Sequence, residues 1–363
     1  MKNNVQQFSV DLAGTELRFQ TGRMAHQADG AVEISYGENM LLATAMMSDN
    51  PREGIDFFPL LVEFDPKFYA TGKIKGSRFM KREARPPESA TLTARMIDRP
   101  LRPMFPKGIM NDVQISLLTL QGDLEHSYSA TAINGASLAA LLGGLPLEEA
   151  ISAVRVGLKD GEFFLNPTFE EMEKGDLDLL VAGTEETILM VEAGANLIDN
   201  EKMLEALKFA HGHIKTICVA QKEFIAKHEI EPKVPMIRPT DESAEELVDK
   251  VITESDLEGV SGIMKKDVKK KMKVLEGKLL EAYASQIEEG EISKGALLGE
   301  LNKRFAKNMR KRIFEKGERV DGRKMDEIRP LHIEAGLFPR VHGSALFQRG
   351  ETQALSMLSL IHI

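Results

Sequence analysis

The sequence predicts an α+β protein that continues into a helical domain and then into a second set of strands. Three observations support this fold class. Residues 5–64 read as strands and turns, with apolar residues at alternate positions of the strands. A long amphipathic helix closes this region near residue 225. The later chain is charged, poor in glycine and helical in period. The domains expected are residues 1–231, 240–316 and 319–363.

The first domain reads as strands and helices in alternation. Phe8, Val10 and Leu12 alternate with polar neighbours, and residues 39–47 form a nearly continuous apolar run suited to a central strand. Residues 127–142 are rich in alanine and leucine, which predicts a helix that packs closely on a sheet. The further elements expected are strands at 113–120, 151–156, 163–165, 177–182 and 188–192, and a helix at 203–225.

Length and composition limit the class of protein. A chain of 363 residues with 42% hydrophobic content can form two or three domains with real cores. The single cysteine, Cys218, excludes an internal disulfide framework, and its position in the apolar period of the last helix makes it a core residue. No signal-type apolar region follows the N-terminal charge, and no apolar run reaches about 18 residues. We therefore expect a cytoplasmic protein with no membrane contact.

A basic island lies within this acidic chain. Residues 67–107 hold eleven Lys or Arg against three acidic residues, a net charge of +8 in a chain whose total is −9. A local positive region on an acidic protein predicts a local polyanionic partner, and we favour single-stranded RNA. The alternative is a solvated or salt-bridged surface without a ligand. The same two interpretations apply to the lysine-rich residues 265–273.

The island combines a loop and one helix. Gly72, Gly76 and the pair Pro86-Pro87 predict a loop, and Ser89 is a plausible N-cap for the helix that follows. The prolines at 100 and 103 are expected to stop this helix. Its arginines recur at helical spacing, so that a loop and one helix face would present cations together.

Several consecutive blocks carry a resemblance to a known family. They are Phe57-Phe58-Pro59-Leu60, Gly72-Lys73-Ile74, Lys81-Arg82-Glu83, Arg85-Pro86 and the run from Ala94 to Pro106, ARMIDRPLRPMFP. Their order resembles the first core of polynucleotide phosphorylase, which implies a ribonuclease PH-like fold. In that family the loop corresponding to residues 79–85 helps to grip single-stranded RNA at the mouth of a trimeric ring. This chain departs from the pattern at Arg78, Met80 and Ala84. The residues expected to contact RNA are Phe79, Met80, Lys81, Arg82, Arg85, Arg95, Arg99 and Arg102.

The last segment repeats the spacing of an early one. Residues 343–351 and 30–38 share a Gly-x6-Gly-Glu pattern. Together with Arg319-Val320-Asp321-Gly322-Arg323, this segment resembles the start of the family's second core, and the helical residues then correspond to the domain between the cores. A sheet that ends at Ile363 would leave unpaired edges, so we expect a truncated second core.

The only suggestive acidic pair is Asp176 and Asp178, whose alternate positions on a strand could hold a divalent cation. The family's active core has a lysine where this chain has Leu180, and an upstream acid about where it has Met172. We therefore interpret Asp178 as a structural relic and keep both aspartates only as weak catalytic candidates. We expect no catalytic residue and no metal site in this chain, and place the Mg²⁺ site and the catalytic residues of the family beyond Ile363.

The resemblance implies a processive 3′-to-5′ exoribonuclease that uses inorganic phosphate to release nucleoside diphosphates, reversibly. It also implies a homotrimer that can join RNA-degradation partners such as a helicase or an endonuclease. Two alternatives remain open. In the first, the chain acts on its own as a catalytically inactive RNA-binding module; in the second, it is a structural subunit of a ring. The start of a second core argues against the last reading, because such subunits carry one core each.

Overall fold

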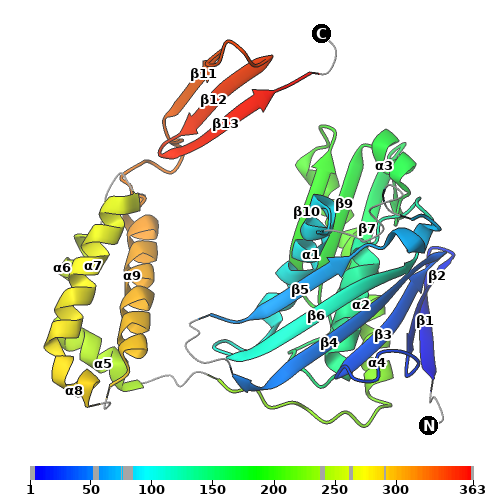
Figure 1. Ribbon diagram of the computed structural model, residues 1–363, viewed down its shortest axis with the longest axis horizontal. Coiled ribbons are helices and arrows are strands. Elements are labelled where there is room, and N and C mark those ends of the chain that lie inside the picture. Colours follow the sequence, from blue (N-terminus) through cyan, green and yellow to red (C-terminus); the bar gives the residue numbers. More distant parts are fainter. Residues whose placement is uncertain are drawn as a thin grey trace. The chain divides into compact units, whose positions relative to one another are not determined.

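The computed structural model describes residues 5–51, 57–74, 76, 85–237, 242–260, 265–289 and 292–360. The chain divides into two compact units, Met1–Arg238 and Pro239–Ile363, and each is described by itself (Figure 1). Among the helices in these residues, none has both the length and the apolar character needed to cross a bilayer.

Unit 1 contains a six-stranded sheet with the strand order β1-β2-β3-β4-β6-β5. Neighbouring strands are antiparallel except β5 and β6, which are parallel. Apolar residues on alternate positions of these strands are buried, as their period predicts. The strands are β1 (Gln6–Leu12), β2 (Thr15–Thr21), β3 (Gly30–Tyr36), β4 (Asn39–Pro51), β5 (Leu60–Asp65) and β6 (Asn111–Gln121).

A second sheet in unit 1 has four strands in the order β10-β9-β7-β8, all antiparallel. The short helix α3 (Phe169–Lys174) lies between β8 and β9 in sequence and begins with a capping box formed by Thr168 and Glu171. The strands are β7 (Ser152–Lys159), β8 (Glu162–Leu165), β9 (Leu177–Gly183) and β10 (Ile188–Ala195).

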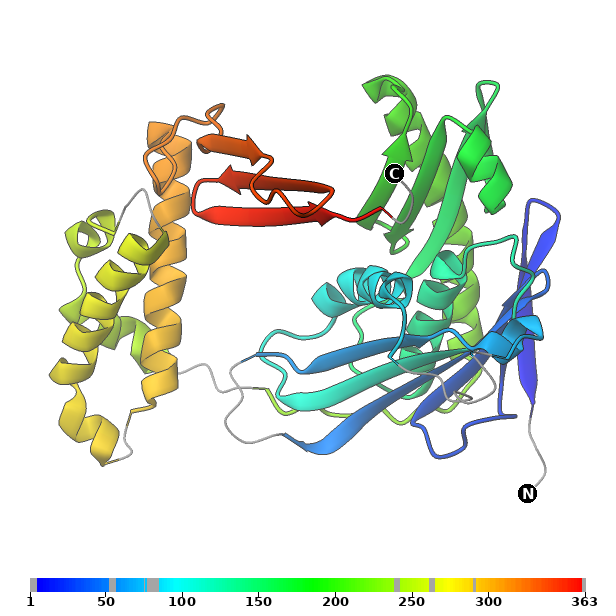
Figure 2. The same cartoon turned by 45° about the horizontal axis from the view of Figure 1, so that its top comes forward.

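Helix α2 (Ser129–Leu142) lies between the two sheets and contacts strands of both (Figure 2). Twelve of its fourteen residues are buried, so it has no solvent-exposed face. Its buried polar side chains pair with the start of β7. Asn134 Oδ1 accepts from the backbone N–H of Ala153 at 2.8 Å, and Ser137 Oγ accepts from that of Ile151 at 2.8 Å. The helix thus holds the second sheet by hydrogen bonds as well as by packing.

Glycine permits the closest contact between α2 and the first sheet. A Cβ atom on Gly30 would lie 1.9 Å from the carbonyl oxygen of Ala139 and 2.6 Å from the amide nitrogen of Gly143. Both are backbone atoms, which cannot move aside as a side chain can. No side chain larger than hydrogen fits at this point without a shift of α2.

Two expectations about helix α1 (Glu88–Leu101) are wrong in detail. The N-cap is Pro87 rather than Ser89, because the extended backbone of Pro87 allows the helix to begin at the next residue. Pro100 lies inside the last turn instead of ending the helix before it, and a short 3₁₀ turn, η2 (Arg102–Met104), follows. The helix packs against β5, α2 and β10.

The remaining long helix of unit 1 is α4 (Asn200–Ile225), which packs on β7, β9 and β1. Its N-cap is Asp199, whose side chain accepts from the N–H of Lys202. A further 3₁₀ turn, η1 (Phe68–Thr71), follows β5.

The first part of unit 2 is helical. Its apolar residues recur at helical spacing and form a separate core that includes Val248, Leu279 and Leu297. The helices are α5 (Glu242–Val251), α6 (Glu254–Glu258), α7 (Lys265–Ala282), α8 (Ala284–Glu288) and α9 (Lys294–Lys316).

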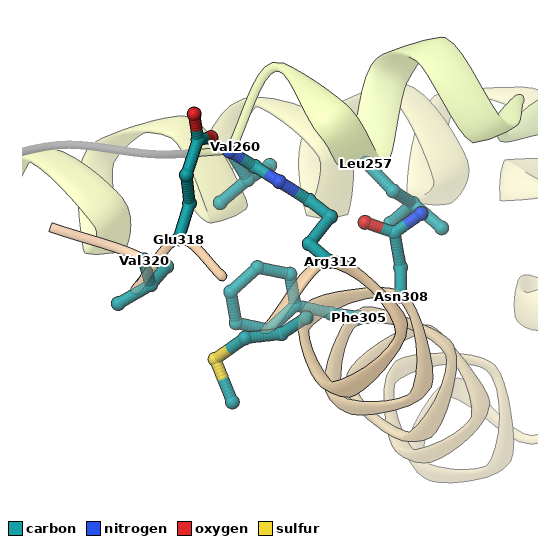
Figure 3. A pocket seen from close by; sticks show the side chains of 8 residues that line it. Leu257, Val260, Phe305, Asn308, Arg312, Glu318 and Val320 are labelled. Atoms are coloured by element: carbon teal, nitrogen blue, oxygen red, sulfur yellow. Dashed lines mark ion pairs between the residues drawn. The ribbon is translucent and has the colours of Figure 1, made fainter. Parts of the chain in front are cut away.

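The chain that leaves α9 is fixed against α6. Arg312 of α9 donates to the carbonyl oxygen of Glu258 at 3.0 Å and lies 3.8 Å from the carboxylate of Glu318. Apolar side chains, among them Phe305 and Val320, line a shallow depression beside this pair (Figure 3). The polar contacts set the position at which the chain passes from helix to strand.

Unit 2 ends in a three-stranded antiparallel sheet, β11-β12-β13, formed by Leu331–Ala335, Gly343–Arg349 and Thr352–Leu358. It repeats β2, β3 and β4 of unit 1 in order and register. The turn glycines Gly37 and Gly350 have φ angles of 57° and 62°, and the closing pairs are Tyr36 with Asn39 and Arg349 with Thr352. The internal repeat predicted from the glycine spacing is therefore confirmed at the level of strands and turn.

Candidate nucleic-acid interface

The predicted RNA-contacting residues divide into two groups. Phe79, Met80, Lys81 and Arg82 lie outside the described residues. Arg85 is described, and it is exposed just before the two prolines that precede α1.

Helix α1 presents two arginines one turn apart. Its buried residues Ile97 and Leu101 face the core, whereas Arg95 and Arg99 are exposed. Arg99 Nη1 lies 3.0 Å from Glu192 Oε2 on β10, with both side chains about half exposed. Among the described residues, Arg95 has no hydrogen-bond or ion-pair partner. Of the two arginines on this helix face, only Arg99 has an ion-pair partner among the described residues.

Arg102 has a different environment, since it makes four hydrogen bonds within the protein. Its guanidinium donates to both carboxylate oxygens of Asp98, at 3.0 and 2.6 Å, and to the carbonyl oxygens of Phe58 and Leu60, each at 3.1 Å. It also lies 5.5 Å from the centroid of the Phe58 ring. These contacts tie the end of α1 to the start of β5. A role in RNA binding stays a prediction for Arg102, and it would require this side chain to leave its present partners.

The acidic pair does not form an open cation site. Asp178 is held by Arg155 through two bonds, Nε to Oδ1 at 2.5 Å and Nη2 to Oδ2 at 2.6 Å. Arg155 Nη1 also donates to the hydroxyls of Ser127 and Ser129, at 2.8 and 3.1 Å. Both carboxylate oxygens of Asp178 thus already face a fixed positive charge.

Asp176 lies just before β9 and is exposed, so the two aspartates do not share one strand as expected. Its backbone N–H donates to Leu158 O and its carbonyl accepts from Asn196 N–H, each at 2.9 Å. Within the described ranges, no group of three or more His, Cys, Asp or Glu side chains could hold a metal ion. The described residues therefore do not fit a Mg²⁺ site at this pair.

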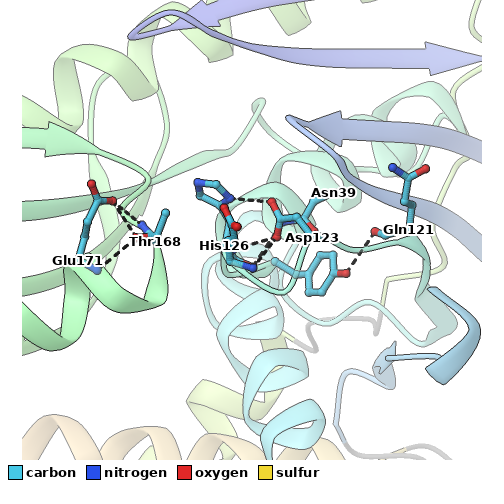
Figure 4. Close-up of polar contacts among 8 residues, drawn as sticks. Asn39, Gln121, Asp123, His126, Thr168 and Glu171 are labelled. Atoms are coloured by element: carbon cyan, nitrogen blue, oxygen red, sulfur yellow. Dashed lines mark hydrogen bonds and ion pairs between the residues drawn. The ribbon is translucent and has the colours of Figure 1, made fainter. Parts of the chain in front are cut away.

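Sequence reasoning missed an ordered turn that leads into α2. Asp123 accepts from the backbone N–H groups of Glu125 and His126, at 2.8 and 3.0 Å, and its Oδ2 lies 2.7 Å from His126 Nδ1 (Figure 4). Asn39 joins the turn to β4, since its Oδ1 accepts from Asp123 N–H at 3.0 Å. An aspartate two residues before a backbone donor is a known turn signal and could have revealed it. The turn positions Ser127, whose hydroxyl accepts a hydrogen bond from Arg155.

The electrostatics of this turn favour a charged carboxylate. Burial alone would raise the pKa of Asp123. The hydrogen bonds from the backbone and side chain of His126 and from the backbone of Glu125 together outweigh burial and hold the pKa below its ordinary value. At the neighbouring cap, the hydrogen bond from the Thr168 backbone lowers the pKa of Glu171. Elsewhere, burial raises the pKa of Cys218 to about 11, which agrees with its predicted place in the core.

Asp123→Asn is expected to destabilise the protein at neutral pH and to do so less in acid. Because the folded-state pKa of Asp123 is lowered, its carboxylate stabilises the fold above the ordinary value of 3.8. That contribution is lost as the pH falls through the folded-state pKa. Thermal unfolding of both proteins from about pH 7 to about pH 3 measures the effect. The two Tm curves should converge in acid, whereas parallel curves would contradict the assignment. Asp160→Asn, at an exposed turn position, is the matched control.

Comparison with known proteins identifies the family. Residues 14–146 match domain 1 of the 3′ exoribonuclease family, and residues 149–213 match domain 2. The chain belongs to the 3′ exoribonuclease family. The α+β ribonuclease PH-type fold class predicted from the sequence is thereby confirmed.

Similar family members extend beyond the two matched domains. The chain is 42% identical over 360 residues to a polyribonucleotide nucleotidyltransferase of Gloeobacter violaceus, covering 97% of this chain and 50% of the relative. It is 43% identical over 364 residues to that of Halothermothrix orenii, covering 97% and 51%. The chain spans about half the length of the curated relatives it matches. The predicted resemblance to the N-terminal part of polynucleotide phosphorylase is confirmed by these matches. Among solved structures, rice (Oryza sativa) Rrp46 is 15% identical with a TM-score of 0.44, covering 62% of this chain and 94% of its own.

Proposed function

We propose that this chain forms the RNA-gripping N-terminal part of a phosphorolytic 3′-to-5′ exoribonuclease, which converts polyribonucleotide and phosphate to nucleoside diphosphates, reversibly. The observation that carries the proposal is the identity of about 42% to polyribonucleotide nucleotidyltransferases over nearly the whole chain. Mg²⁺, inorganic phosphate, a cytoplasmic location, a homotrimer and RNA-degradation partners belong to the same proposal. We place the Mg²⁺ and catalytic residues beyond Ile363, in the half of the curated relatives that this chain does not cover.

The proposed RNA grip uses charge without base recognition. Arg85, Arg95 and Arg99 are exposed, and they follow the predicted loop residues in the sequence. Guanidinium groups bind phosphates of any sequence, and aromatic side chains stack on any base. Such a surface suits an enzyme that moves along RNA one nucleotide at a time.

A second candidate function is that of a catalytically inactive RNA-binding module on its own. The ion pair between Arg155 and Asp178 favours it, because the fixed guanidinium fills the place beside the carboxylate where a divalent cation would bind. Electrostatic stabilisation of a transferring phosphoryl group requires cations that face the substrate rather than a carboxylate of the protein.

One assay separates the two functions. The purified 363-residue chain is mixed with labelled oligoadenylate, Mg²⁺ and phosphate, and both RNA retention and ADP release are measured. Retention without ADP would support an RNA-binding part whose chemistry lies elsewhere. Phosphate-dependent ADP release would show that this chain is catalytic by itself, and Asp176 and Asp178 would become the first residues to substitute. Loss of both signals would contradict both candidates.

Arg95→Gln combined with Arg99→Gln should weaken oligoadenylate binding and flatten its salt dependence. For a single strand, each phosphate that the protein neutralises contributes about −0.7 to the slope of log K against log salt. The slope of the double variant should therefore be about 1.4 less negative than that of the wild type. Fluorescence anisotropy across salt concentrations measures this. Lys174→Gln is the control, because Lys174 is an exposed cation on α3, outside the predicted RNA-contacting residues. An unchanged slope in the double variant would remove α1 from the RNA site.

Lys81→Ala with Arg82→Ala tests the predicted loop that precedes α1 in sequence. This variant should also bind oligoadenylate more weakly and with a flatter salt dependence, and unchanged affinity and slope would remove the loop from the RNA site.

A further inference from the structure

One exposed face of α9 combines an aromatic ring with unpaired cations. Phe314 is 86% exposed, although it lies in a regular helix of 23 residues. Lys307, Arg310 and Lys311 precede it by seven, four and three residues, which places all four on one side of the helix. Phe305, which packs in the helical core, lies nine residues earlier, about two and a half turns, and therefore on the opposite side.

These cations differ from the other basic residues of the unit. Elsewhere in unit 2, Lys and Arg side chains are commonly paired with carboxylates. The pairs are Lys278 with Asp256, Lys303 with Glu300, Arg304 with Asp249, Arg312 with Glu318, Lys316 with Glu258 and Arg323 with Asp321. By contrast, Lys307, Arg310 and Lys311 have no ion-pair or hydrogen-bond partner in the part of the chain that the structure describes. Among the described residues, no carboxylate lies within ion-pair distance of these three cations to offset their mutual repulsion.

The N-terminal half of α7 adds further charge at the same end of the helical bundle. Figures 1 and 2 show α7 and α9 running antiparallel, and the contact of Arg312 with Glu258, shortly before α7, agrees with this arrangement. Lys269, Lys270 and Lys273 are exposed there, on the side of α7 away from the buried Leu275. Among the described residues these three lysines also have no partner. The combined positive potential favours a polyanion.

We propose that this end of the helical unit is a second binding surface for single-stranded RNA, separate from α1. Phe314 stacks on a base, and Lys307, Arg310 and Lys311 hold the flanking phosphates. Stacking on an aromatic ring beside cations is the mode by which proteins bind single strands without sequence preference. An apolar protein partner fits less well, because covering Phe314 would also remove three unpaired charges from water. The inference rests on the proposed RNA substrate, but not on the assignment of α1.

The test uses the full 363-residue chain and labelled oligoadenylate, with anisotropy titrations between about 50 and about 200 mM salt. Phe314→Ala should weaken RNA binding by roughly 5- to 150-fold, which is the loss expected for one stacked base. Phe314→Trp should keep the wild-type RNA affinity, because tryptophan also stacks on a base. Arg310→Gln with Lys311→Gln should make the slope of log K against log salt less negative by about 1.4. Lys303→Gln is the matched control on α9, because Glu300 already pairs with that lysine. Because Phe314 is exposed, its substitution should leave the thermal unfolding curve unchanged.

Each outcome bears on the proposal. Wild-type affinity and slope in both α9 variants would overturn it. A change in oligomer mass with Phe314→Ala, at unchanged RNA affinity, would show a protein contact instead and would also overturn it. If only the Arg95 and Arg99 double variant loses affinity, the α1 interface stands and this inference fails. If only the α9 variants lose affinity, this inference stands and the α1 assignment fails.

Discussion

Gly30→Ala is expected to destabilise unit 1 by roughly 3 kcal/mol or more, or to prevent its folding. The added Cβ would lie 1.9 Å from Ala139 O and 2.6 Å from Gly143 N, so α2 would have to move away from β3. Because α2 also packs on the second sheet, that movement would disturb both layers. Urea unfolding followed by circular dichroism measures the loss as a lower midpoint, and the soluble yield reports any failure to fold.

Gly343→Ala is the matched control, because Gly343 occupies the corresponding position of the repeated strand pair. A Cβ there would meet Leu358 Cβ at 3.3 Å and no backbone atom within 4 Å. We expect a change within about 1 kcal/mol. Equal effects at the two glycines would show that the cost at Gly30 comes from the strand conformation rather than from the approach of α2.

Arg155→Ala is expected to cost roughly 2–4 kcal/mol of folding free energy. The substitution removes both bonds to Asp178 and those to Ser127 and Ser129, and it leaves a partly buried carboxylate without its cation. The side chains of Arg155 and Asp178 are only 19% and 32% exposed, so water can replace the lost partner only in part. Chemical denaturation at neutral pH gives the value.

A double-mutant cycle separates the ion pair from packing. Asp178→Asn in the Arg155→Ala background should recover part of the loss, because the remaining polar group then carries no charge. Arg18→Ala is the surface control: Arg18 pairs with Glu16 on the exposed face of β2, and its loss should cost less than about 1 kcal/mol. Additive effects of the Arg155 and Asp178 substitutions would contradict the coupling assigned to this pair.

Local patterns predicted the fold well because each depends on neighbouring residues. Alternation in β2 and β4 and the alanine-rich run of α2 identify their elements directly. The glycine spacing also predicted the repeat, since Gly37 and Gly350 each take the left-handed backbone that the same turn requires. Both domains of the matched family lie within the first expected domain, whereas the three domain boundaries stay a prediction.

The candidate site was less predictable because its contacts join distant residues. Arg95 and Arg102 look equivalent in sequence, but only Arg102 meets the carbonyl oxygens of Phe58 and Leu60, more than forty residues earlier. The partner of Asp178 lies 23 residues away on β7, and the strand register that brings Arg155 there is not visible in either segment alone. Sequence reasoning could interpret Asp178 as a relic but could not name the group that neutralises it.

The position of α2 between two sheets has a consequence for how unit 1 folds. A helix without a solvent-exposed face gains little from packing on one sheet alone, and its Asn134 and Ser137 find partners only when β7 is in place. Both sheets and α2 must therefore assemble in one cooperative step. The backbone amides of α2 should exchange with solvent only through global opening of unit 1, whereas helices of unit 2 with exposed faces, such as α7, can open locally.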